Sequence, residues 1–481
     1  MIKSYETQKP AVPTRKKVNI SLFKGLNTAV DEEVLPFSYS PKTYNYSFGK
    51  GTLDVGYGVQ AAYINVGGSR WQIKKRGITV KFLKFFHYTM HHLASRAEKL
   101  VGYANDGKLY AMTISSLYSS FTEVSGSYGE VLDAVPYVYN DEDGLLVSTA
   151  NGLYFLHETT ITRLSFSQIL STMCVHNDRV FAVLKPDEYK LYFSDDFDPK
   201  NWQISLQEGG YFAFDTEMGK VVKVISHGGY VFLFFEHGIM RLTAYNQQTE
   251  FRLQKLYLSP GTIYPGTVAV CGDKMIFASS DGVFSFDGVQ IKKIMSEAED
   301  LFDSEQAHAF AVHHGGKYYL ACRLKMDSEI AGANNSLVVY DVWKDSFDVA
   351  HDINVLSMVA LETDAVRGVL TEVDYPVNYI GLIGKVGAVD STPTNKLWQS
   401  PVTSFGVSNG KKLLREFRLR TEGGGVLKVW LDGALLSFAF ADGLSVIKVM
   451  RPFDKLHLAI TSSSASSRVV LAEMTVDLYG E

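Results

Sequence analysis

Short apolar runs separated by turn residues fill most of the chain, and residues 264–295 give the clearest example. The last two turns of this stretch are Asp281-Gly282 and Asp287-Gly288. Asp-Gly is a strong hairpin signal because glycine adopts a positive φ without steric cost and aspartate tolerates one. The stretch therefore predicts four short antiparallel strands, at 268–270, 275–279, 283–286 and 290–294.

This unit recurs along the chain. Each copy places a small or polar residue before an aliphatic residue and then, mostly, an aromatic one, at 108–110, 152–155, 190–193, 238–240, 282–284 and, after a loop insertion, 336–341. The first five copies follow the period of roughly 40–50 residues expected of four-stranded blades. One small sheet cannot bury both of its faces, whereas radially stacked sheets can. We therefore predict an all-β fold in which residues 59–384 form a β-propeller of about six blades.

Residues 397–481 have a different pattern, in which apolar and polar residues alternate along longer strands. The alternation is clean at 413–420 and 426–430. Such strands have one buried and one solvated face, as in an antiparallel sheet packed on a second sheet. A Gly-, Pro- and Thr-rich linker at 384–396 precedes them, so we expect a separate C-terminal antiparallel β-sandwich.

Residues 1–58 show no sustained period of two or of 3.6. The first 18 are polar, and the rest are rich in aromatic residues. We expect an extended, irregular assembly arm whose large side chains insert into neighbouring surfaces: Phe23, Leu35, Phe37, Tyr44 and Phe48. Residues 53–55 are candidates to pair into the first or last blade and so close the ring. A short helix is expected at 296–303, where Ser296 and Glu299 have the spacing of a capping box.

Composition and charge narrow the functional classes. Of the 481 residues, 46% are hydrophobic and 13% aromatic, which excludes a largely disordered chain. The longest apolar runs are far below the ~20 residues that span a bilayer, and the N-terminus lacks the apolar stretch of a secretory signal. We therefore expect synthesis and folding in a cytoplasm. The formal charge of −5 comes without a broad basic patch, so tight binding of DNA is not expected.

Several residues could carry chemistry. His87, His91 and His92 are conceivable metal ligands, but their spacing in a strand-to-loop region does not place all three on one face. Asp195, Asp196 and Asp198 lack the alternating spacing of a calcium loop, and His313-His314 precedes a Gly-Gly turn. The well-separated Cys174, Cys271 and Cys322 are expected to be buried, reduced thiols.

No nucleophile, nucleotide-binding or zinc-protease motif stands in a suitable context. We therefore predict no enzyme activity, no catalytic residue, no cofactor and no metal. A pair of carboxylates converging in the central channel could still form a hydrolase site, because sequence alone does not place such a pair.

Some of these residues resemble a known family. Gly25-Leu26-Asn27-Thr28, Leu35-Pro36, Ser40-Pro41 and Asn45 are similar to the N-terminal signature of β-propeller virion proteins from tailed bacteriophages and prophages. Further similarities are residues 191–195 with Asn201-Trp202, residues 281–288, residues 337–341 and the closing sandwich. The resemblance spans nearly the whole chain, and its motifs belong to a scaffold rather than to a catalytic centre.

The resemblance implies a structural part of a phage tail, most readily a nozzle or hub protein. Such proteins form a ring of copies, sixfold or twelvefold, below the portal and adaptor, and DNA is ejected through the ring without specific binding. The implied location is the virion tail, after assembly in the host cytoplasm. We expect the surface facing the DNA to be neutral or acidic, with the basic clusters at 74–76 and 411–412 pointing outwards or into subunit interfaces.

A second interpretation belongs to a different class. The chain could be a tail protein that binds or degrades carbohydrate at the host surface on the same propeller scaffold. Exposed Trp or Tyr side chains beside paired carboxylates, in the channel or the sandwich, would favour it.

Overall fold

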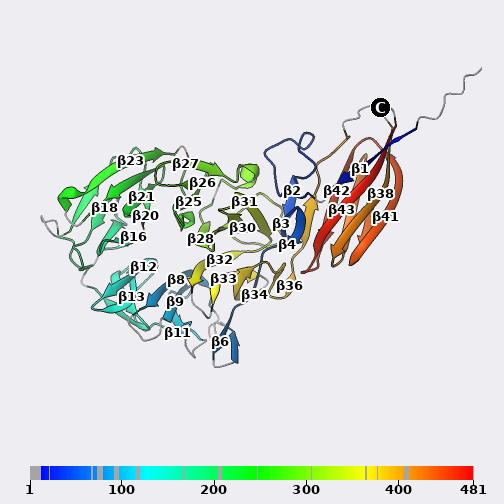
Figure 1. Ribbon diagram of the computed structural model, residues 1–481. Helices are drawn as coiled ribbons and strands as arrows, with labels where there is room; N and C mark the ends of the chain where they lie inside the picture. Colours follow the sequence, from blue (N-terminus) through cyan, green and yellow to red (C-terminus); the bar gives the residue numbers. More distant parts are fainter. Residues whose placement is uncertain are drawn as a thin grey trace, which may run out of the picture. The chain divides into compact units, whose positions relative to one another are not determined.

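The computed structural model describes residues 12–20, 22–66, 69–72, 80–91, 97–114, 120–164, 166, 168–203, 209–245, 248–259, 261–304, 306–362, 366–375, 377–405 and 411–479 (Figure 1). The chain divides into two compact units. The larger unit comprises residues 59–347 and 352–383, and the smaller unit comprises residues 1–58, 348–351 and 384–481. The prediction of an all-β fold is confirmed. The helices of the described residues are three 3-10 helices: η1 (Gln248–Glu250), η2 (Pro265–Thr267) and η3 (Ser296–Leu301).

Six four-stranded sheets follow one another in the described residues between 82 and 351, each with its strands side by side in chain order. They belong to the larger unit except for residues 348–351, the end of the last strand, which belong to the smaller unit. The first three consist of β8 (Phe82–Met90), β9 (Ala97–Ala104), β10 (Leu109–Thr113) and β11 (Thr122–Glu123); β12 (Val131–Tyr139), β13 (Glu142–Thr149), β14 (Gly152–His157) and β15 (Thr160–Arg163); and β16 (Leu170–His176), β17 (Arg179–Leu184), β18 (Asp187–Phe193) and β19 (Gly210–Ala213).

The next three consist of β20 (Val221–His227), β21 (Tyr230–Phe235), β22 (Gly238–Thr243) and β23 (Arg252–Leu258); β24 (Ala269–Cys271), β25 (Lys274–Ser279), β26 (Gly282–Phe286) and β27 (Ile291–Ile294); and β28 (Phe310–His314), β29 (Lys317–Cys322), β30 (Ser336–Asp341) and β31 (Ser346–His351). The four strands predicted at 268–294 are thus confirmed as β24–β27, and Gly282 and Gly288 in their turns have φ of 120° and 94°.

A further sheet combines the two ends of the larger unit. It begins with β32 (Val355–Glu362), β33 (Arg367–Tyr375) and β34 (Val377–Gly384), and its next strand is β5 (Gly58–Ala61). The sequence pointed to residues 53–55 as the closing strand. Those residues instead lie in β4 (Thr52–Val55), which pairs with β43 (Arg468–Tyr479) in the smaller unit. A hairpin of β6 (Tyr63–Val66) and β7 (Ser69–Gln72) follows β5.

Neighbouring sheets of the larger unit pack through shared apolar clusters. Leu146 of β13 packs in one cluster with Val180 of β17, and Phe234 of β21 packs in another with Phe277 of β25. Phe82 of the first sheet shares a cluster with Leu370 of the last, so the series of sheets closes on itself. Figure 1 shows β8, β12, β16, β20, β28 and β32 on the inner side of this closed series. The arrangement is consistent with the predicted β-propeller.

The smaller unit contains two sheets. One has the order β3 (Tyr46–Gly49), β4, β43, β38 (Lys411–Glu422) and β41 (Gly443–Phe453), with β1 (Thr14–Asn19) also paired to β43; the other has the order β2 (Lys42–Tyr44), β37 (Lys396–Gln399), β42 (Leu456–Ser462), β39 (Gly425–Leu431) and β40 (Ala434–Phe440). A short hairpin of β35 (Ala388–Val389) and β36 (Thr392–Pro393) belongs to the same unit.

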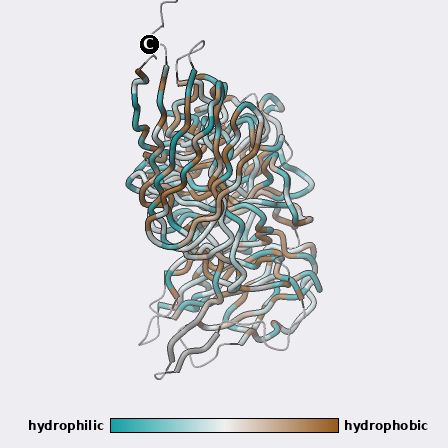
Figure 2. Tube along the Cα trace, turned by 90° about the vertical axis from the view of Figure 1, so that its right-hand side faces the viewer, coloured by the Kyte–Doolittle hydropathy of each residue, from teal (hydrophilic) through white to brown (hydrophobic). Residues whose placement is uncertain are grey.

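Side chains from both sheets of the smaller unit form one buried cluster, which includes Trp398, Phe417 and Leu458. Residues alternate between the cluster and the solvent along β38, and the hydropathy colouring near the C-terminus alternates in the same way (Figure 2). The described residues that the sequence placed in an extended arm contribute β1–β4 to these two sheets.

The helix expected at 296–303 is shorter and is capped differently. It is the 3-10 helix η3, its N-cap residue is Met295 with φ 55°, and no side chain caps it. The capping-box prediction is therefore wrong, because Ser296 lies inside the helix. Glu299 instead pairs with Lys293 of β27 at 2.6 Å.

Candidate functional site

Five inner strands of the larger unit share a β-bulge near their first residue. Each bulge inserts one extra residue, after an apolar residue and before a polar one: Phe82/Lys84 in β8, Val131/Asp133 in β12, Leu170/Thr172 in β16, Val221/Lys223 in β20 and Val355/Ser357 in β32. A bulge re-aims the side chains beside it, and bulges recur next to functional sites. We call Lys84, Asp133, Thr172, Lys223 and Ser357 the axial polar residues.

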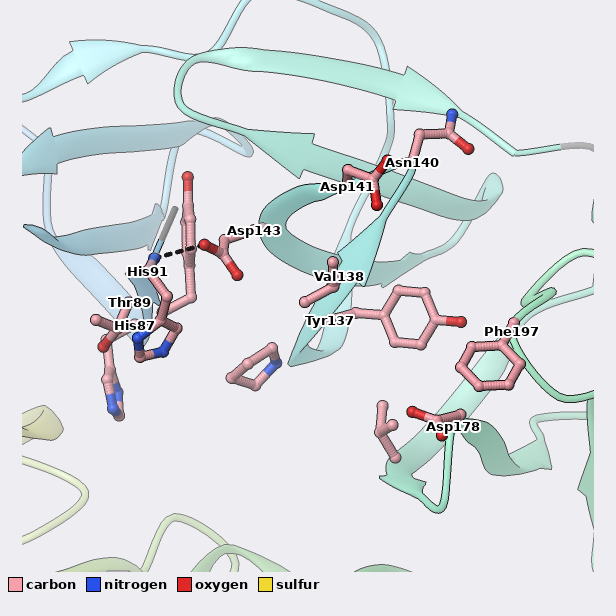
Figure 3. A pocket seen from close by; sticks show the side chains of 14 residues that line it. His87, Thr89, His91, Tyr137, Val138, Asn140, Asp141, Asp143, Asp178 and Phe197 are labelled. Atoms are coloured by element: carbon pink, nitrogen blue, oxygen red, sulfur yellow. Dashed lines mark hydrogen bonds between the residues drawn. The ribbon is translucent and has the colours of Figure 1, made fainter. Parts of the chain in front are cut away.

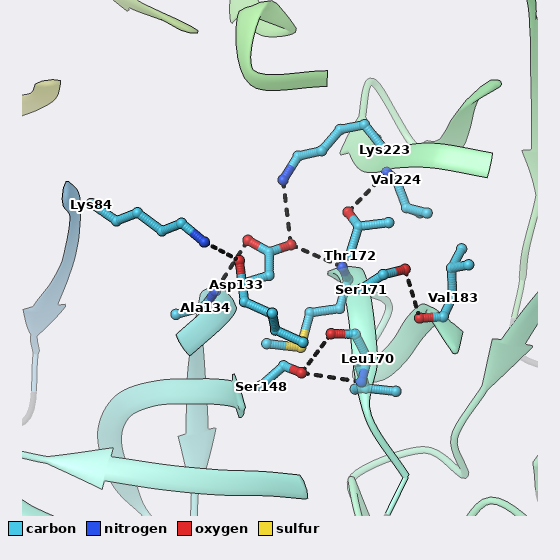
Figure 4. Close-up of polar contacts among 12 residues, drawn as sticks. Lys84, Asp133, Ala134, Ser148, Leu170, Ser171, Thr172, Val183, Lys223 and Val224 are labelled. Carbon is cyan, nitrogen blue, oxygen red and sulfur yellow. Dashed lines mark hydrogen bonds and ion pairs between the residues drawn. The ribbon is translucent and has the colours of Figure 1, made fainter. Parts of the chain in front are cut away.

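Three axial polar residues each bond the backbone of the next inner strand (Figure 4). The Lys84 ammonium donates to the carbonyl oxygens of Val131 and Leu132 at 3.0 Å each. Asp133 Oδ2 accepts from the Met173 amide at 3.0 Å. Thr172 Oγ1 accepts from the Val224 amide at 3.3 Å. These bonds fasten β8 to β12, β12 to β16 and β16 to β20.

The charges of the axial polar residues do not balance. Lys223 Nζ pairs with Asp133 Oδ2 at 3.3 Å, and Asp133 Oδ1 accepts from the Ala134 amide at 3.1 Å. Among the described residues, no carboxylate lies within ion-pair distance of Lys84. Burial lowers the pKa of the Lys84 ammonium, against an opposing effect of the more distant Asp133 and Glu130 carboxylates. One lysine thus remains without a matching anion.

An axial cavity of about 700 Å³ lies beside these groups. Residues at or near the first positions of β8, β12, β20, β28 and β32 line it, so it lies toward the N-terminal ends of the inner strands. Lys84, Asp133, Lys223 and Ser357 are among the lining residues, and the buried Asn354 joins them. Its volume falls within the range of roughly 300–1,000 Å³ typical of small-molecule pockets.

A second pocket, which we call the trough, has a volume of about 680 Å³ and lies at the other ends of the inner strands (Figure 3). Its lining comes from the last residues of β8, β12 and β16, from the first residues of β13, and from the turns that follow β12, β16 and β18. Figure 3 shows the ring of Tyr137 pointing toward Phe197, with Asp178 nearby. Asp141 and Asn140 come from the β12–β13 turn.

Phe197 at the rim of the trough is conformationally unusual. The residue is 73% exposed, and its φ of 57° lies in the left-handed region, which a bulky residue rarely adopts. The Phe197 amide donates to the Asp178 carbonyl oxygen at 3.0 Å and so helps to hold this conformation. Burial, assisted by the nearby Asp178 carboxylate, raises the pKa of Tyr137 to about 12. The trough therefore presents aromatic rings beside carboxylates.

The candidate metal ligands are only partly brought together. His87 and His91 both line the trough, and His92 lies outside the described residues. His87 Nε2 lies 3.9 Å from Glu98 Oε1, and the His91 amide, not its ring, donates to Asp143 Oδ2 at 2.6 Å. Within the described ranges, no group of three or more His, Cys, Asp or Glu side chains could hold a metal ion.

The other candidates have structural partners. Asp195 and Asp196 form ion pairs with the buried Arg179 at 3.7 and 3.3 Å, and Asp198 Oδ1 accepts from the Lys200 amide. The turn expected at residues 313–316 comprises only Gly315-Gly316, because His313 and His314 are the last residues of β28, and His314 Nδ1 lies 3.1 Å from Glu362 Oε1. The predicted burial of the three cysteines as free thiols is confirmed.

The basic clusters differ from expectation in one respect. Lys411 is exposed, but the Lys412 ammonium is buried in the smaller unit and donates to the Asp454 carbonyl oxygen at 2.7 Å. The placement predicted for Lys412, outwards or into a subunit interface, is therefore wrong, because consecutive residues of a strand face opposite sides and Lys412 faces the interior of its own unit. The cluster at 74–76 lies outside the described residues.

The sequence reasoning missed the axial polar residues. A signal was present, since an apolar residue stands two places before a polar one where the first strand of five repeats begins. Reading that signal requires knowing that a bulge lies between the two residues. Without the bulge, both would be assigned to the same face of the strand.

Comparisons with known proteins add the following. No protein-family model and no curated protein sequence matches the chain. Among solved structures, one of BBS1N in complex with ARL6DN matches with a TM-score of 0.43 and 8% identity, over 67% of this chain and 98% of that chain. Chaetomium thermophilum Raptor matches with a TM-score of 0.43 and 12% identity, over 69% of this chain and 29% of that chain. YCF48 bound to D1 peptide matches with a TM-score of 0.36 and 10% identity, over 53% of this chain and 78% of that chain. At these values they carry no information about what this chain does. No helix among the described residues is long and apolar enough to cross a bilayer.

Proposed function

We propose that the chain is a structural component of a bacteriophage tail, a nozzle or hub protein whose copies form a ring through which DNA is ejected. The observation that supports this proposal most is the place of the residues that resemble the phage signature. They fasten the N-terminal segment to other parts of the smaller unit, which is a role that a scaffold signature would have.

Asn45 is the clearest of these residues. Its side chain is buried, and its amide nitrogen donates to the Asn395 carbonyl oxygen at 2.6 Å and to the His351 carbonyl oxygen at 3.4 Å. Its Oδ1 accepts from the His351 amide at 2.7 Å. Its φ of 60° is tolerated by asparagine better than by most other residues. The hydrogen bonds and the backbone conformation together favour asparagine at this position.

Ser40 and its neighbours act in the same way. Ser40 is fully buried, and its hydroxyl donates to the Gln399 carbonyl oxygen at 2.7 Å. Leu26 and Ser40 form a bridge, and the Asn27 amide donates to the Ser40 carbonyl oxygen at 2.8 Å. These contacts hold a stretch that has no periodic pattern of its own.

In this proposal the larger unit is a seven-bladed propeller, because six four-stranded sheets are followed by β32-β33-β34-β5, and the smaller unit is a β-sandwich. A propeller filled by side chains around its own axis is too narrow for duplex DNA. The DNA would therefore pass between copies, which requires a closed cyclic assembly.

The proposal is tested on phage particles released from the bacterium that carries this sequence, purified by density gradient. We expect peptides of this chain by mass spectrometry in intact particles, and gold-labelled antibody at the tail. Particles with complete tails that contain no peptide of this chain would refute the proposal.

A specific observation also favours the second candidate function, binding of a host-surface carbohydrate. The trough combines the rings of Tyr137 and Phe197 with the carboxylates of Asp141 and Asp178. Sugar rings present C–H groups that pack on aromatic faces and hydroxyls that donate to carboxylates. Pockets with an apolar lining and a few convergent polar groups are typical ligand sites.

The variant Phe197→Gly tests the trough, since glycine accepts the positive φ at this position. If the trough binds carbohydrate, the affinity for purified host cell-wall or capsule polysaccharide falls by about tenfold or more when a stacking ring is lost. Val289→Gly, which removes another exposed apolar side chain of the same unit, is the control and should leave affinity unchanged. Equal affinity of all three proteins would exclude this role.

A further inference from the structure

We propose that the axial cavity binds a small oxyanion, a molecule that presents a carboxylate or phosphate group to Lys84 and Lys223. The proposal does not depend on the tail function. It rests on the surplus positive charge at the cavity and on the hydrogen-bond donors that converge there.

The surplus follows from the pairing of the axial polar residues. Asp133 is satisfied by two backbone amides and by Lys223, so its charge is matched. The two contacts of Lys84 are neutral carbonyl oxygens. An ammonium has three donors, which leaves one N–H of Lys84 without a protein acceptor among the described residues. A half-buried charge without a counter-ion is costly, and an anion in the cavity would remove that cost.

Fastening the blades does not require this charge. Thr172 has the same position after its bulge and bonds the next inner strand with a neutral hydroxyl. Lys84 joins β8 to β12 in the opposite hydrogen-bond sense, because its charged ammonium donates to two carbonyl oxygens where the Thr172 oxygen accepts from an amide. If the only role of Lys84 were to join neighbouring strands, a neutral donor would be the less costly choice. The ammonium at β8 therefore indicates a second role.

Other donors complete the site. Lys223 shares the cavity lining, its side chain is 28% exposed, and its ion pair with Asp133 uses one of its three donors. Ser357 and Asn354, whose side chains carry hydrogen-bond donors, are also lining residues. Figure 4 shows Lys84 and Lys223 approaching Asp133 from opposite sides. Charge-assisted hydrogen bonds from lysine to an oxyanion are the strong kind, and Lys is a common phosphate ligand.

The test is isothermal titration of inorganic phosphate, and separately of acetate, into the full-length protein at constant ionic strength in chloride buffer. We expect saturable binding with one site per chain for at least one of the two anions. Lys84→Met, which keeps the aliphatic stem, should weaken binding by about tenfold. Asp133→Asn should strengthen binding several-fold, because it removes the charge that holds Lys223, while its one side-chain oxygen still accepts from one of the two backbone amides.

Lys292→Met is the matched control. It removes an exposed lysine of the same unit, one that pairs with Asp345, and should leave binding unchanged. Circular dichroism of each variant verifies folding, and Lys84→Gln replaces Lys84→Met if the latter does not fold. The proposal is overturned if neither phosphate nor acetate shows saturable binding in the chloride buffer. It is also overturned if the Lys84 variant binds the anion as tightly as the wild type, or if Asp133→Asn weakens anion binding.

Discussion

Two lysines, one in each unit, make the same pair of contacts in different surroundings. Lys84 donates to the carbonyl oxygens of the successive residues Val131 and Leu132, and Lys396 donates to those of Ser464 and Ala465. Lys396 is 2% exposed and enclosed by its unit, whereas Lys84 lines the axial cavity. The pair of carbonyls alone therefore does not distinguish a structural lysine from a ligand-binding one. The space beside the ammonium does.

The largest expected difference is in stability. Lys396→Ala removes a fully buried chain of methylene groups and leaves two carbonyls without a donor, so it should lower the free energy of unfolding by about 3 kcal/mol. Lys84→Ala removes a side chain that already lines a cavity and a charge without a counter-ion. It should therefore lower the free energy of unfolding by about 1 kcal/mol or less. Denaturant titration of both variants measures this difference. Equal losses in the free energy of unfolding would contradict the claim that the two lysines differ in their surroundings.

The pH dependence of stability sharpens the comparison. Burial lowers the pKa of Lys396 to about 8 from its ordinary 10.5. Between these values the unfolded chain holds a proton that the folded chain has lost. The Lys396 contribution to the free energy of unfolding therefore rises with pH across this window, by at most about 1.4 kcal/mol per pH unit.

The buried thiols lower the free energy of unfolding as the pH rises, which is the opposite of the Lys396 effect, because burial raises the pKa of Cys174, Cys271 and Cys322. The measurement is accordingly the difference between wild type and Lys396→Met from pH 7.5 to 9.5. The free energy of unfolding of the wild type should rise relative to that of Lys396→Met as the pH rises. A difference that stays constant over the window would show that the Lys396 pKa is not lowered.

The smallest effect is expected at the neutral axial residue. Thr172→Val keeps the side-chain shape but leaves the Val224 amide unpaired, which should cost about 1 kcal/mol. Because the variant removes no charge, phosphate and acetate binding should be unchanged. Loss of anion binding in this variant would mean that the geometry of the bulges, rather than the lysine charge, determines binding.

Much of the larger unit could be predicted because its signals are local. The Asp281-Gly282 and Asp287-Gly288 turns and the apolar runs between them specify hairpins without reference to distant residues. The strand that completes the last sheet could not be placed, because β5 lies about 300 residues away in the chain from the strand beside it, and short segments at 53–55 and 58–61 look alike as strands.

The N-terminal segment and the axial site were less predictable for a different reason. Ser40 and Asn45 hold their segment through hydrogen bonds to backbone atoms more than 300 residues away, and such bonds leave no periodic pattern. Lys84 and Asp133 come together because two bulges re-aim them, which composition and spacing do not reveal. The resemblance identified Ser40 and Asn45 without indicating what they contact.

The measurement that most directly tests the proposed tail function is an electron cryomicroscopy map of the intact phage particle. The account predicts several copies of this chain in a closed ring around the tail axis, with a neutral or acidic surface toward the DNA and the exposed Lys411 away from it. A map that shows the chain as an isolated monomer, or with basic side chains lining the DNA channel, would contradict the proposed function.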